Sequence, residues 1–387
     1  MKENPNFSNA TKNISLVNSG KEYFSRLEQL ILESKSEIHI QTYIFEYDSI
    51  GQKIIKALKN AASSNVKIYI LIDGFGSFYF PSKVMDELNQ MSINIRFFSP
   101  LSSMNSLYLG RRLHHKVVVI DSKIVLIGGI NIAEKYYGTK NGAAWLDFAV
   151  QLNNEEIAVA ASRICLNIYL RKRQIHRNKI ASFLNTNEIE MVSLLQNDWL
   201  KRKTEISDGY VNSIRNAKDE IVIVGSYFLP GRRLIRALKK ASKNGVKIKL
   251  ILSGISDLPM ARRASCHFYS KLLNYNIELY EWKKSILHGK AAVIDGNWTT
   301  IGSFNLNNLS SYGSLEINLG INSSTFSNEF LLHLNQIMSQ CEKITPESLR
   351  LIDSLPTKFI NWISYLITRA IEIIITYFPY KRLRKLY

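Results

Sequence analysis

Cysteine is scarce in this chain. Only three cysteines, Cys165, Cys266 and Cys341, occur among 387 residues, and they are far apart. An odd number of isolated cysteines argues against a disulfide framework and is compatible with a reducing compartment. A cytoplasmic location is therefore favoured.

Several motifs of other enzyme classes are also absent. The sequence has no Gly-rich phosphate loop of the nucleotide-binding kind and no His-Glu-x-x-His pattern of a zinc-binding helix. We accordingly expect a reaction without a metal ion or a cofactor. Residues 1–15 are polar, rich in asparagine and lack the apolar core of a signal peptide, so we expect a flexible tail there.

A short polar pattern is present in two copies. Histidine, lysine, aspartate and asparagine recur at identical offsets, as His114, Lys116, Asp121 and Asn131, and again as His288, Lys290, Asp295 and Asn305. Chance would hardly reproduce this spacing twice. The six histidine, lysine and aspartate residues are therefore the candidate catalytic set, and the two asparagines are candidates for binding the substrate.

The local pattern around each copy predicts a β-hairpin. On a strand, a period of two places the histidine and the lysine on one face, whereas the aspartate has the opposite parity and begins a turn. The turns Asp121-Ser122-Lys123 and Asp295-Gly296-Asn297 stand between apolar runs, so the chain should return and bring each asparagine toward its histidine. For the two aspartates this position favours a structural role over direct chemistry.

These residue types suit phosphoryl chemistry. An imidazole can attack an electrophile or transfer a proton near neutral pH, and lysine and asparagine can stabilise a phosphate.

A repeat also extends beyond the motif. Residues 37–40, 54–59 and 66–68 read strand, helix, strand, and so do residues 220–223, 234–239 and 246–248. This alternation predicts an α/β fold with helices covering a parallel or mixed sheet.

The paired motif resembles the H-x-K-x4-D-x6-G-[GS]-x-N pattern of the phospholipase D superfamily. Between about residues 16 and 345 the chain is similar to the bacterial cardiolipin synthase branch, with family blocks at residues 41–45, 73–77, 96–98 and 145–147. The resemblance implies two α/β/α layered domains, residues 16–185 and 186–345, related by a pseudo-twofold axis with one active site in the cleft between them. It also implies a short form without an amino-terminal pair of transmembrane helices.

The same resemblance implies a role for each site residue. His114 would attack the phosphodiester, His288 would act as acid and base, and the lysines and asparagines would hold the phosphate oxygens. An acid downstream of each motif, Asp147 after the first and Glu316 after the second, would orient the histidine. His115 stands where the family often has arginine; we interpret it as pointing away from the site, although the sequence leaves open an exchange of roles with His114.

The net charge and the carboxyl-terminal sequence indicate which partners the protein could bind. Fifty Lys and Arg against 32 Asp and Glu give a formal charge of +18, which would attract nucleic acid or anionic lipid equally. Residues 346–387 are predicted to be an amphipathic, membrane-associating segment, in which an apolar stripe and a polar stripe over residues 359–378 precede the cations of residues 381–385. A spanning helix, or a helix packed on the protein itself or on a dimer partner, is the alternative.

Together these features predict a transphosphatidylase at the cytoplasmic face of a bacterial membrane. Phosphatidylglycerol or another phospholipid would be the donor, and a second phosphatidylglycerol would be the acceptor. A phospholipase D hydrolase and a nuclease or phosphodiesterase of the same superfamily are the alternatives, although nucleic acid is disfavoured by the family blocks and the amphipathic tail. A non-catalytic membrane-binding module is disfavoured because neither copy lacks a motif residue.

Overall fold

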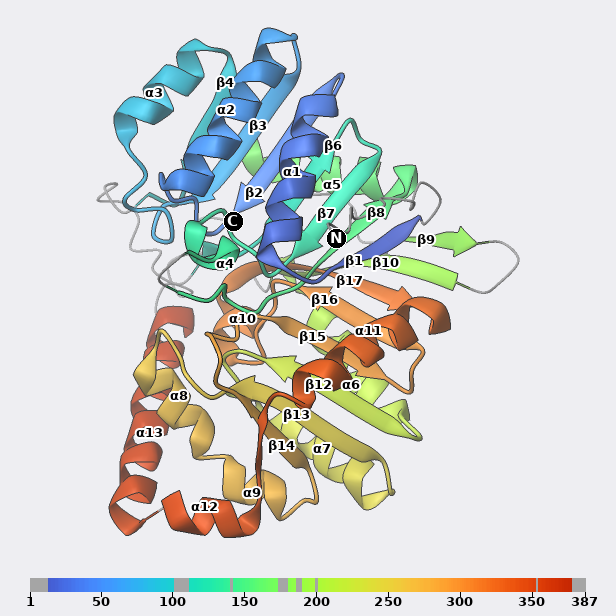
Figure 1. Cartoon of the computed structure of the whole chain (residues 1–387), viewed down its shortest axis with the longest axis vertical. Coiled ribbons are helices and arrows are strands. Elements are labelled where there is room, and N and C mark those ends of the chain that lie inside the picture. Colours follow the sequence, from blue (N-terminus) through green and yellow to red (C-terminus); the bar gives the residue numbers. More distant parts are fainter. Residues whose placement is uncertain are drawn as a thin grey trace, which may run out of the picture.

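Two β-sheets, each carrying helices, form the body of the protein (Figure 1). The computed structural model describes residues 13–100, 111–139, 142–172, 180–185, 190–198, 201–352 and 354–377. We refer to residues 13–172 as the first half and to residues 180–352 as the second half. A long carboxyl-terminal helix, α13, lies against the second half.

The first half alternates strands and helices. Its elements are β1 (Ile14–Val17), α1 (Gly20–Glu33), β2 (Glu37–Thr42), α2 (Ser49–Ser63), β3 (Lys67–Asp73), α3 (Ser82–Gln90), β4 (Ile93–Phe98), β5 (Arg112–Leu113), β6 (Lys116–Ile120), β7 (Ile124–Gly128), α4 (Glu134–Tyr137), β8 (Ala149–Asn153) and α5 (Glu155–Tyr169). Its sheet has the order β1-β8-β7-β6-β2-β3-β4.

The second half repeats this arrangement. Its elements are β9 (Ile180–Asn185), β10 (Glu190–Asp198), β11 (Lys203–Thr204), α6 (Glu205–Asn216), β12 (Glu220–Gly225), α7 (Arg232–Lys243), β13 (Lys247–Ser253), α8 (Pro259–Cys266), α9 (Tyr269–Leu273), β14 (Glu278–Trp282), β15 (Lys290–Ile294), β16 (Trp298–Gly302), α10 (Asn308–Tyr312), β17 (Ser314–Asn322), α11 (Ser324–Met338), β18 (Glu342–Ile344), α12 (Pro346–Ile352) and α13 (Leu355–Tyr377). The run β17-β16-β15-β12-β13-β14 corresponds to β8-β7-β6-β2-β3-β4 in the first half.

The predicted α/β class and the internal repeat are confirmed. In each half the first three long strands of the repeat are parallel, as in β2, β3 and β4, and the motif hairpin is added antiparallel to the first of them. The sheets are therefore mixed. The predicted helices appear as α2, where the Asp48 carboxylate accepts a hydrogen bond from the Gly51 N–H at 2.8 Å as an N-cap, and as α7.

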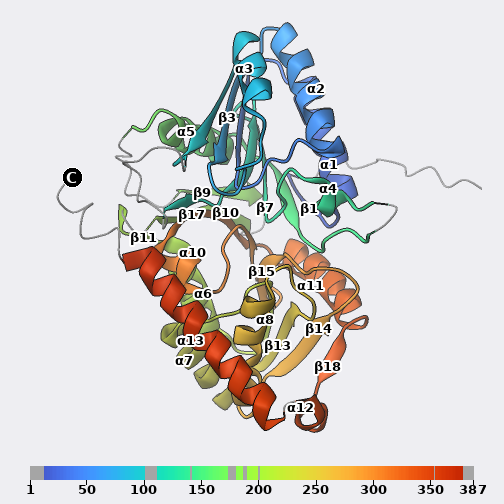
Figure 2. The same ribbon diagram turned by 90° about the vertical axis from the view of Figure 1, so that its left-hand side faces the viewer.

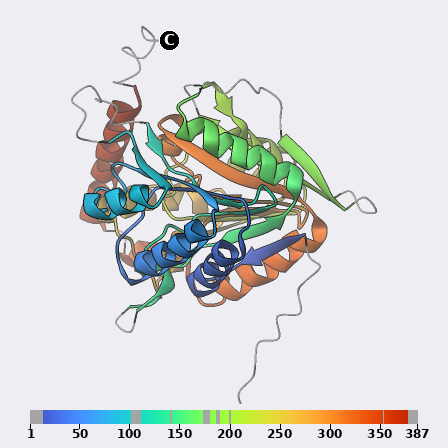
Figure 3. The same cartoon turned by 90° about the horizontal axis from the view of Figure 1, so that it is seen from above.

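The core has three parts. Helices α1 and α2 cover one face of the first sheet, and α6, α7 and α8 cover the equivalent face of the second sheet. Helices α5 and α11 lie on the inner faces, and one apolar cluster combines residues from both sheets and from both of these helices. Figure 3 shows α5 on the opposite side of the first sheet from α1 and α2. The two halves thus share a core.

Two predicted boundaries lie close to strands β1 and β9. Residues 1–12 of the predicted tail lie outside the described residues, but Ile14 and Ser15 are in β1, which pairs with the edge strand β8. The β-branched and apolar residues of this segment suit an edge strand. Strand β9 begins at Ile180 and pairs with β10 in the second sheet, a few residues before the domain boundary expected after residue 185.

Candidate active site

The two motif histidines come together between the halves, and each ring is held by a buried acid. His114 Nδ1 lies 2.9 Å from Glu316 Oε2, and His288 Nδ1 lies 2.6 Å from Asp147 Oδ2. Both carboxylates are almost completely buried. The Glu316 carboxylate also accepts a hydrogen bond from the Ser303 hydroxyl at 2.5 Å. In addition to burial, the charges of Lys116 and Lys290 each lower the pKa of both histidines, so the two histidines and their acids belong to one site.

The acids are crossed between the halves. The expectation that Asp147 would hold the first-motif histidine and Glu316 the second is wrong. The backbone explains why: the His114 N–H donates to the Leu315 carbonyl at 3.0 Å, next to Glu316. In the other half, the His288 N–H donates to the carbonyl of Leu146, the residue before Asp147, at 2.8 Å. Each histidine segment is thus bound to the acid-bearing segment of the opposite half.

The carboxylates fix the histidine tautomers. A carboxylate at Nδ1 favours a proton on that nitrogen and leaves Nε2 for chemistry. Burial lowers the pKa of His114, although the nearby Glu316 raises it. Burial also holds the pKa of His288 well below its usual range, and the charges of Lys290 and Lys116 lower it further. Without a bound anion, burial therefore favours the neutral form of both rings.

The two motif lysines place positive charge beside the rings. Lys116 Nζ donates to the His114 carbonyl at 2.8 Å, and Lys290 Nζ donates to the His288 carbonyl. Burial lowers the pKa of Lys116 to about 7 and that of Lys290 to about 8, opposed in both cases by nearby carboxylates. The charge of Lys290 lowers the pKa of Lys116 further. A bound phosphodiester would supply the anion that offsets this repulsion.

The motif asparagines are held by hydrogen bonds to neighbouring groups. Asn131 Oδ1 accepts from the Ile44 N–H at 3.0 Å, and its Nδ2 donates to the Tyr136 hydroxyl at 2.6 Å. Asn305 Oδ1 accepts from the Ser226 hydroxyl at 3.0 Å. Both amides are buried. Their contact with phosphate oxygens stays a prediction.

The motif aspartates lie at the other end of the hairpins. Asp121 accepts hydrogen bonds at 2.7 to 3.0 Å from the backbone N–H groups of residues 35–37, and Asp295 does the same at 2.9 to 3.0 Å for residues 218–220. Each anchors its turn to the segment that begins β2 or β12. Both are therefore outside the group around the histidines, in a structural position that their parity predicted.

His115 does not face the site. Its Nδ1 lies 3.0 Å from Gln41 Oε1, and the Gln41 side-chain amide donates to the Cys165 carbonyl at 2.9 Å. His115 is buried, and burial lowers its pKa to about 3. The structure thus gives His114, and not His115, the position beside the acid and the second histidine.

Aromatic side chains surround the two imidazoles. The ring centroids of Tyr43 and His114 are 5.0 Å apart, and those of Tyr227 and His288 are 6.2 Å apart. The two tyrosines stand at equivalent places of the repeat. Tyr136 lies 5.3 Å from His288. No sequence pattern predicted a role for Tyr136, because α4 is a single turn without apolar periodicity. Its position five residues after Asn131 is the only signal.

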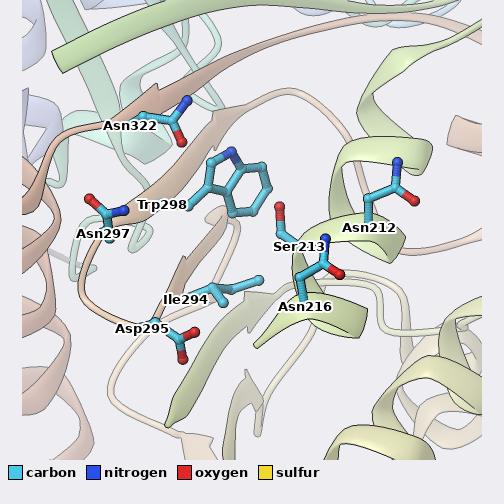
Figure 4. Close-up of a pocket in the computed structure, with 8 residues that line it drawn as sticks. All are labelled: Asn212, Ser213, Asn216, Ile294, Asp295, Asn297, Trp298 and Asn322. Carbon is cyan, nitrogen blue, oxygen red and sulfur yellow. The ribbon is translucent and has the colours of Figure 1, made fainter. Parts of the chain in front are cut away.

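A separate pocket lies at the far end of the second hairpin (Figure 4). It is lined by Asn212, Ser213, Asn216, Ile294, Asp295, Asn297, Trp298 and Asn322. It surrounds the anchoring aspartate and contains no histidine or lysine. The pocket is therefore not the site of the motif chemistry.

Comparison with known proteins places this arrangement in a family. A family model described as "Cardiolipin synthase, PLD-like domain" matches residues 27–163 and again residues 210–338. Cardiolipin synthase B of Escherichia coli strain K12 is 30% identical over 337 residues, which cover 86% of this chain and 82% of that protein. The chain belongs to the cardiolipin synthase family of phospholipase D-like proteins.

Other members and structures agree with this assignment. The minor cardiolipin synthase of Bacillus subtilis is 27% identical over 89% of this chain and 85% of its own length. The crystal structure of a phosphatidylserine synthase from Haemophilus influenzae has a TM-score of 0.74 and 15% identity, covering 94% of this chain and 95% of that one. At this identity the second likeness concerns the fold. The family match in each half corresponds to the repeat in the two sheets.

Proposed function

We propose that this protein is a cardiolipin synthase-type phosphatidyltransferase that joins two phosphatidylglycerol molecules and releases glycerol. The observation that carries the proposal is the similarity to cardiolipin synthases over both halves of the chain. The site is suited to the reaction: two neutral imidazoles, each with a buried carboxylate, stand among two lysines. Such a site can bind a phosphodiester anion and supply both a nucleophile and a proton donor.

The first step forms a covalent intermediate. Nε2 of His114 attacks the phosphorus of phosphatidylglycerol, a P–N bond forms, and the P–O bond to the headgroup glycerol breaks. His288, in its protonated form, gives a proton to the departing glycerol oxygen. The free site disfavours an imidazolium at His288, but the anionic phosphate offsets the charges of Lys116 and Lys290 and so favours its protonation. Acid catalysis of this kind contributes about 10² to 10⁴-fold in rate.

The second step reverses the roles. His288, now neutral, accepts the proton of a headgroup hydroxyl of a second phosphatidylglycerol. The resulting oxygen attacks the phosphorus, the P–N bond to His114 breaks, and cardiolipin leaves. Lys116, Lys290, Asn131 and Asn305 hold the non-bridging oxygens in both steps, and Glu316 and Asp147 hold the rings. Water in place of the second lipid would give phosphatidic acid, the product of a phospholipase D hydrolase.

Product analysis tests the proposal. Purified protein with phosphatidylglycerol vesicles should release one glycerol for each cardiolipin formed, with little phosphatidic acid. Mass spectrometry of the lipids and an enzymatic glycerol assay measure both products. Cleavage of DNA by a preparation that leaves phosphatidylglycerol and phosphatidylethanolamine untouched would favour the nuclease alternative.

Variants of the histidines test the chemistry. His114→Ala and His288→Ala should each abolish turnover while the circular dichroism spectrum and melting temperature stay close to those of the parent. His115→Asn is the matched control, because it removes the neighbouring imidazole without touching the site. Near-parental activity of a folded His114→Ala or His288→Ala variant would disprove the shared-site mechanism.

The protein should work at a membrane, since its proposed substrates are bilayer lipids. The proposed location is the cytoplasmic face, as a peripheral protein. Residues 355–376 form a helix long and apolar enough to cross a bilayer by length and composition alone. The cations of residues 381–385 lie outside the described residues. How this helix sits on the protein decides between spanning and surface binding.

A further inference from the structure

Helix α13 presents its polar face to the protein. Asn361, Ser364, Glu372 and Thr376 are buried, each below 10% exposure, and they follow each other at helical spacing. The Arg369 guanidinium donates to the Pro230 carbonyl at 2.7 Å and to Glu372 at 2.9 Å. A soluble helix normally buries its apolar face instead.

The opposite face of α13 is an exposed apolar stripe. We call this set the outer stripe: Phe359, Ile360, Trp362, Leu366, Ile367, Ile371, Ile373 and Ile374, all at least 40% exposed. Apolar patches of this extent mark a surface that binds another apolar body. A spanning helix would take Arg369 and Glu372 into hydrocarbon and break their contacts with the second half, which is costly. The docked position therefore favours a helix that lies flat on a membrane.

Two loops beside the active site also expose large apolar side chains. They follow β3 and β13, which are equivalent strands of the repeat, and we call residues 74–81 and 254–258 the paired loops. Phe75, Phe78 and Tyr79 in the first are 55%, 58% and 91% exposed. Ile255 and Leu258 in the second are 43% and 52% exposed, and Met260 follows at the start of α8. Both halves thus expose apolar residues at the same place of the fold.

A tyrosine that contacts a motif histidine accepts a hydrogen bond from, or donates one to, each paired loop. The hydroxyl of Ser77 in the first loop donates to the Tyr43 carbonyl at 3.0 Å, and the Tyr43 ring contacts His114. In the second loop, Asp257 accepts a hydrogen bond from the Tyr227 hydroxyl at 2.7 Å, and the Tyr227 ring contacts His288. The exposed loops therefore stand beside the place where the phosphodiester must arrive.

The outer stripe and the paired loops are on one side of the molecule. The second loop leads directly into α8, and α13 packs along α8, where Tyr365 stacks on His267 at 4.7 Å. Figure 2 shows α13 and α8 on the side that faces the viewer, with the end of β3 above them. Exposed cations lie on these elements or directly after a loop: Lys83 on α3, which follows the first loop, Arg263 on α8 and Lys358 on α13. These charges complement anionic lipid headgroups.

We propose that the outer stripe and the paired loops together form one docking surface for an anionic phospholipid bilayer. This proposal rests on the proposed function and specifies how the site meets its lipids. Docked in this way, both loops enter the headgroup region and the two histidines face the bilayer, so a lipid reaches the phosphate site without leaving the membrane completely. Helix α13 lies flat in the headgroup region and sets the orientation of the protein on the membrane. It does not span the bilayer.

Vesicle binding by paired variants tests this surface. We expect Phe75→Ser with Phe78→Ser, Ile255→Ser with Leu258→Ser, and Ile371→Ser with Ile374→Ser each to weaken binding to phosphatidylglycerol-containing vesicles by about tenfold or more, because each pair removes two apolar anchors. Leu332→Ser on α11 with Leu32→Ser on α1 is the matched control: both are at least 50% exposed and belong to neither the stripe nor the loops. The control should bind as the parent does.

Two further measurements separate the possible outcomes. Short-chain phosphatidylglycerol below its micelle concentration should be turned over equally by the parent and by the Ile371→Ser, Ile374→Ser variant. Failure of the parent to form cardiolipin from phosphatidylglycerol vesicles would refute the proposed function, and vesicle binding alone would then test the surface. Parental vesicle binding by the two loop variants would overturn the single-surface proposal. So would a change from dimer to monomer in the stripe variant, measured by sedimentation, with vesicle binding unaltered, because the stripe would then cover a second copy.

Discussion

At the scale of residues, the crossed acids are the decisive feature of the site. Because each histidine takes its carboxylate from the opposite half, neither motif copy is complete alone. The residues that follow strands β7 and β16, Gly129 and Ser303, are matched to the two acids. A Cβ at Gly129 would lie 2.2 Å from an Asp147 oxygen, so only glycine leaves room there for the acid, whereas the equivalent Ser303 binds Glu316 with its hydroxyl. The alternation of glycine and serine in the motif thus follows from the acid that each accommodates.

Amide variants of the two acids should be inactive for a positional reason. Glu316→Gln and Asp147→Asn keep the side-chain size but no longer favour the Nδ1–H tautomer, so we expect turnover to fall by about 10² to 10⁴-fold. Melting temperatures should stay within a few degrees of the parent. Glu87→Gln, which alters an exposed ion pair with Lys59, is the control. Parental turnover by either amide variant would remove the acids from the mechanism.

The lysines predict a dependence on pH. Both have pKa values lowered by burial, to about 7 for Lys116 and about 8 for Lys290, so they are charged below these values and lose their protons as pH rises through them. We expect kcat/KM to fall between about pH 7 and 9, because kcat/KM reports the free enzyme. The value of kcat should fall at higher pH, since the bound anion favours the protonated lysines. Profiles with a soluble short-chain substrate measure both; a kcat/KM that is flat to pH 10 would contradict the assignment.

Most of the site residues could be predicted from the sequence, but their connections could not. The motif spacing identified the histidines and lysines. The aspartates fall at odd offsets along the strand, which predicted a place away from the histidines. The pairing of His114 with Glu316, 202 residues away, depends on how the two sheets meet, and no local pattern records that. Tyr136 was missed for a similar reason, because its neighbour His288 belongs to the other half.

At the scale of elements, the hairpins follow their turn residues closely. Asp121 and Ser122 have positive φ, as have Asp295 and Gly296, and the strands on either side pair antiparallel. The helix α13 shows the opposite case. Its two stripes could be predicted from the sequence, but the stripe that faces the protein could not, because the groups that contact this helix lie on α8, α10 and the Pro230 loop.

The anchoring aspartates should contribute to stability more than to chemistry. Asp121→Ala leaves three backbone N–H groups without their carboxylate, and we expect a loss of about 1–3 kcal/mol in the free energy of unfolding. Partial burial raises the pKa of Asp121, but these hydrogen bonds outweigh it and lower the pKa overall. The loss should therefore be present at neutral pH and shrink as pH falls through the folded pKa. Denaturant titrations at two pH values measure it, with Asp86→Ala on α3 as an exposed control.

Asp295→Ala should show the same pattern at neutral pH, because its three hydrogen bonds repeat those of Asp121. Below the melting temperature, both variants should keep activity within about tenfold of the parent. Complete inactivity of a folded Asp121→Ala or Asp295→Ala protein would show that the aspartate takes part in the reaction.

At the scale of the whole molecule, the shared core makes the two halves one unit. The cluster that includes α5 and α11 also contains the inner faces of both sheets. Strand β5 of the first half pairs with β17 of the second, and residue 146 pairs with residue 287. The division of the core among three clusters depends on the packing of the sheets. The catalytic geometry therefore depends on the same contacts that hold the halves together.

The ring contact between Phe148 and Phe330 tests this unity. Phe148 belongs to the first half and Phe330 to α11 of the second; both are fully buried, with centroids 5.2 Å apart. Phe330→Ala should cost about 3–5 kcal/mol, and the loss should appear in both halves because each half uses the shared cluster. Hydrogen exchange should show faster opening of β6 and β7 as well as of β15 and β16, and calorimetry should show one transition at a lower temperature. Two calorimetric transitions, of which only that of the second half moves to a lower temperature, would mean that the halves unfold independently. The crossed acids alone would then couple them.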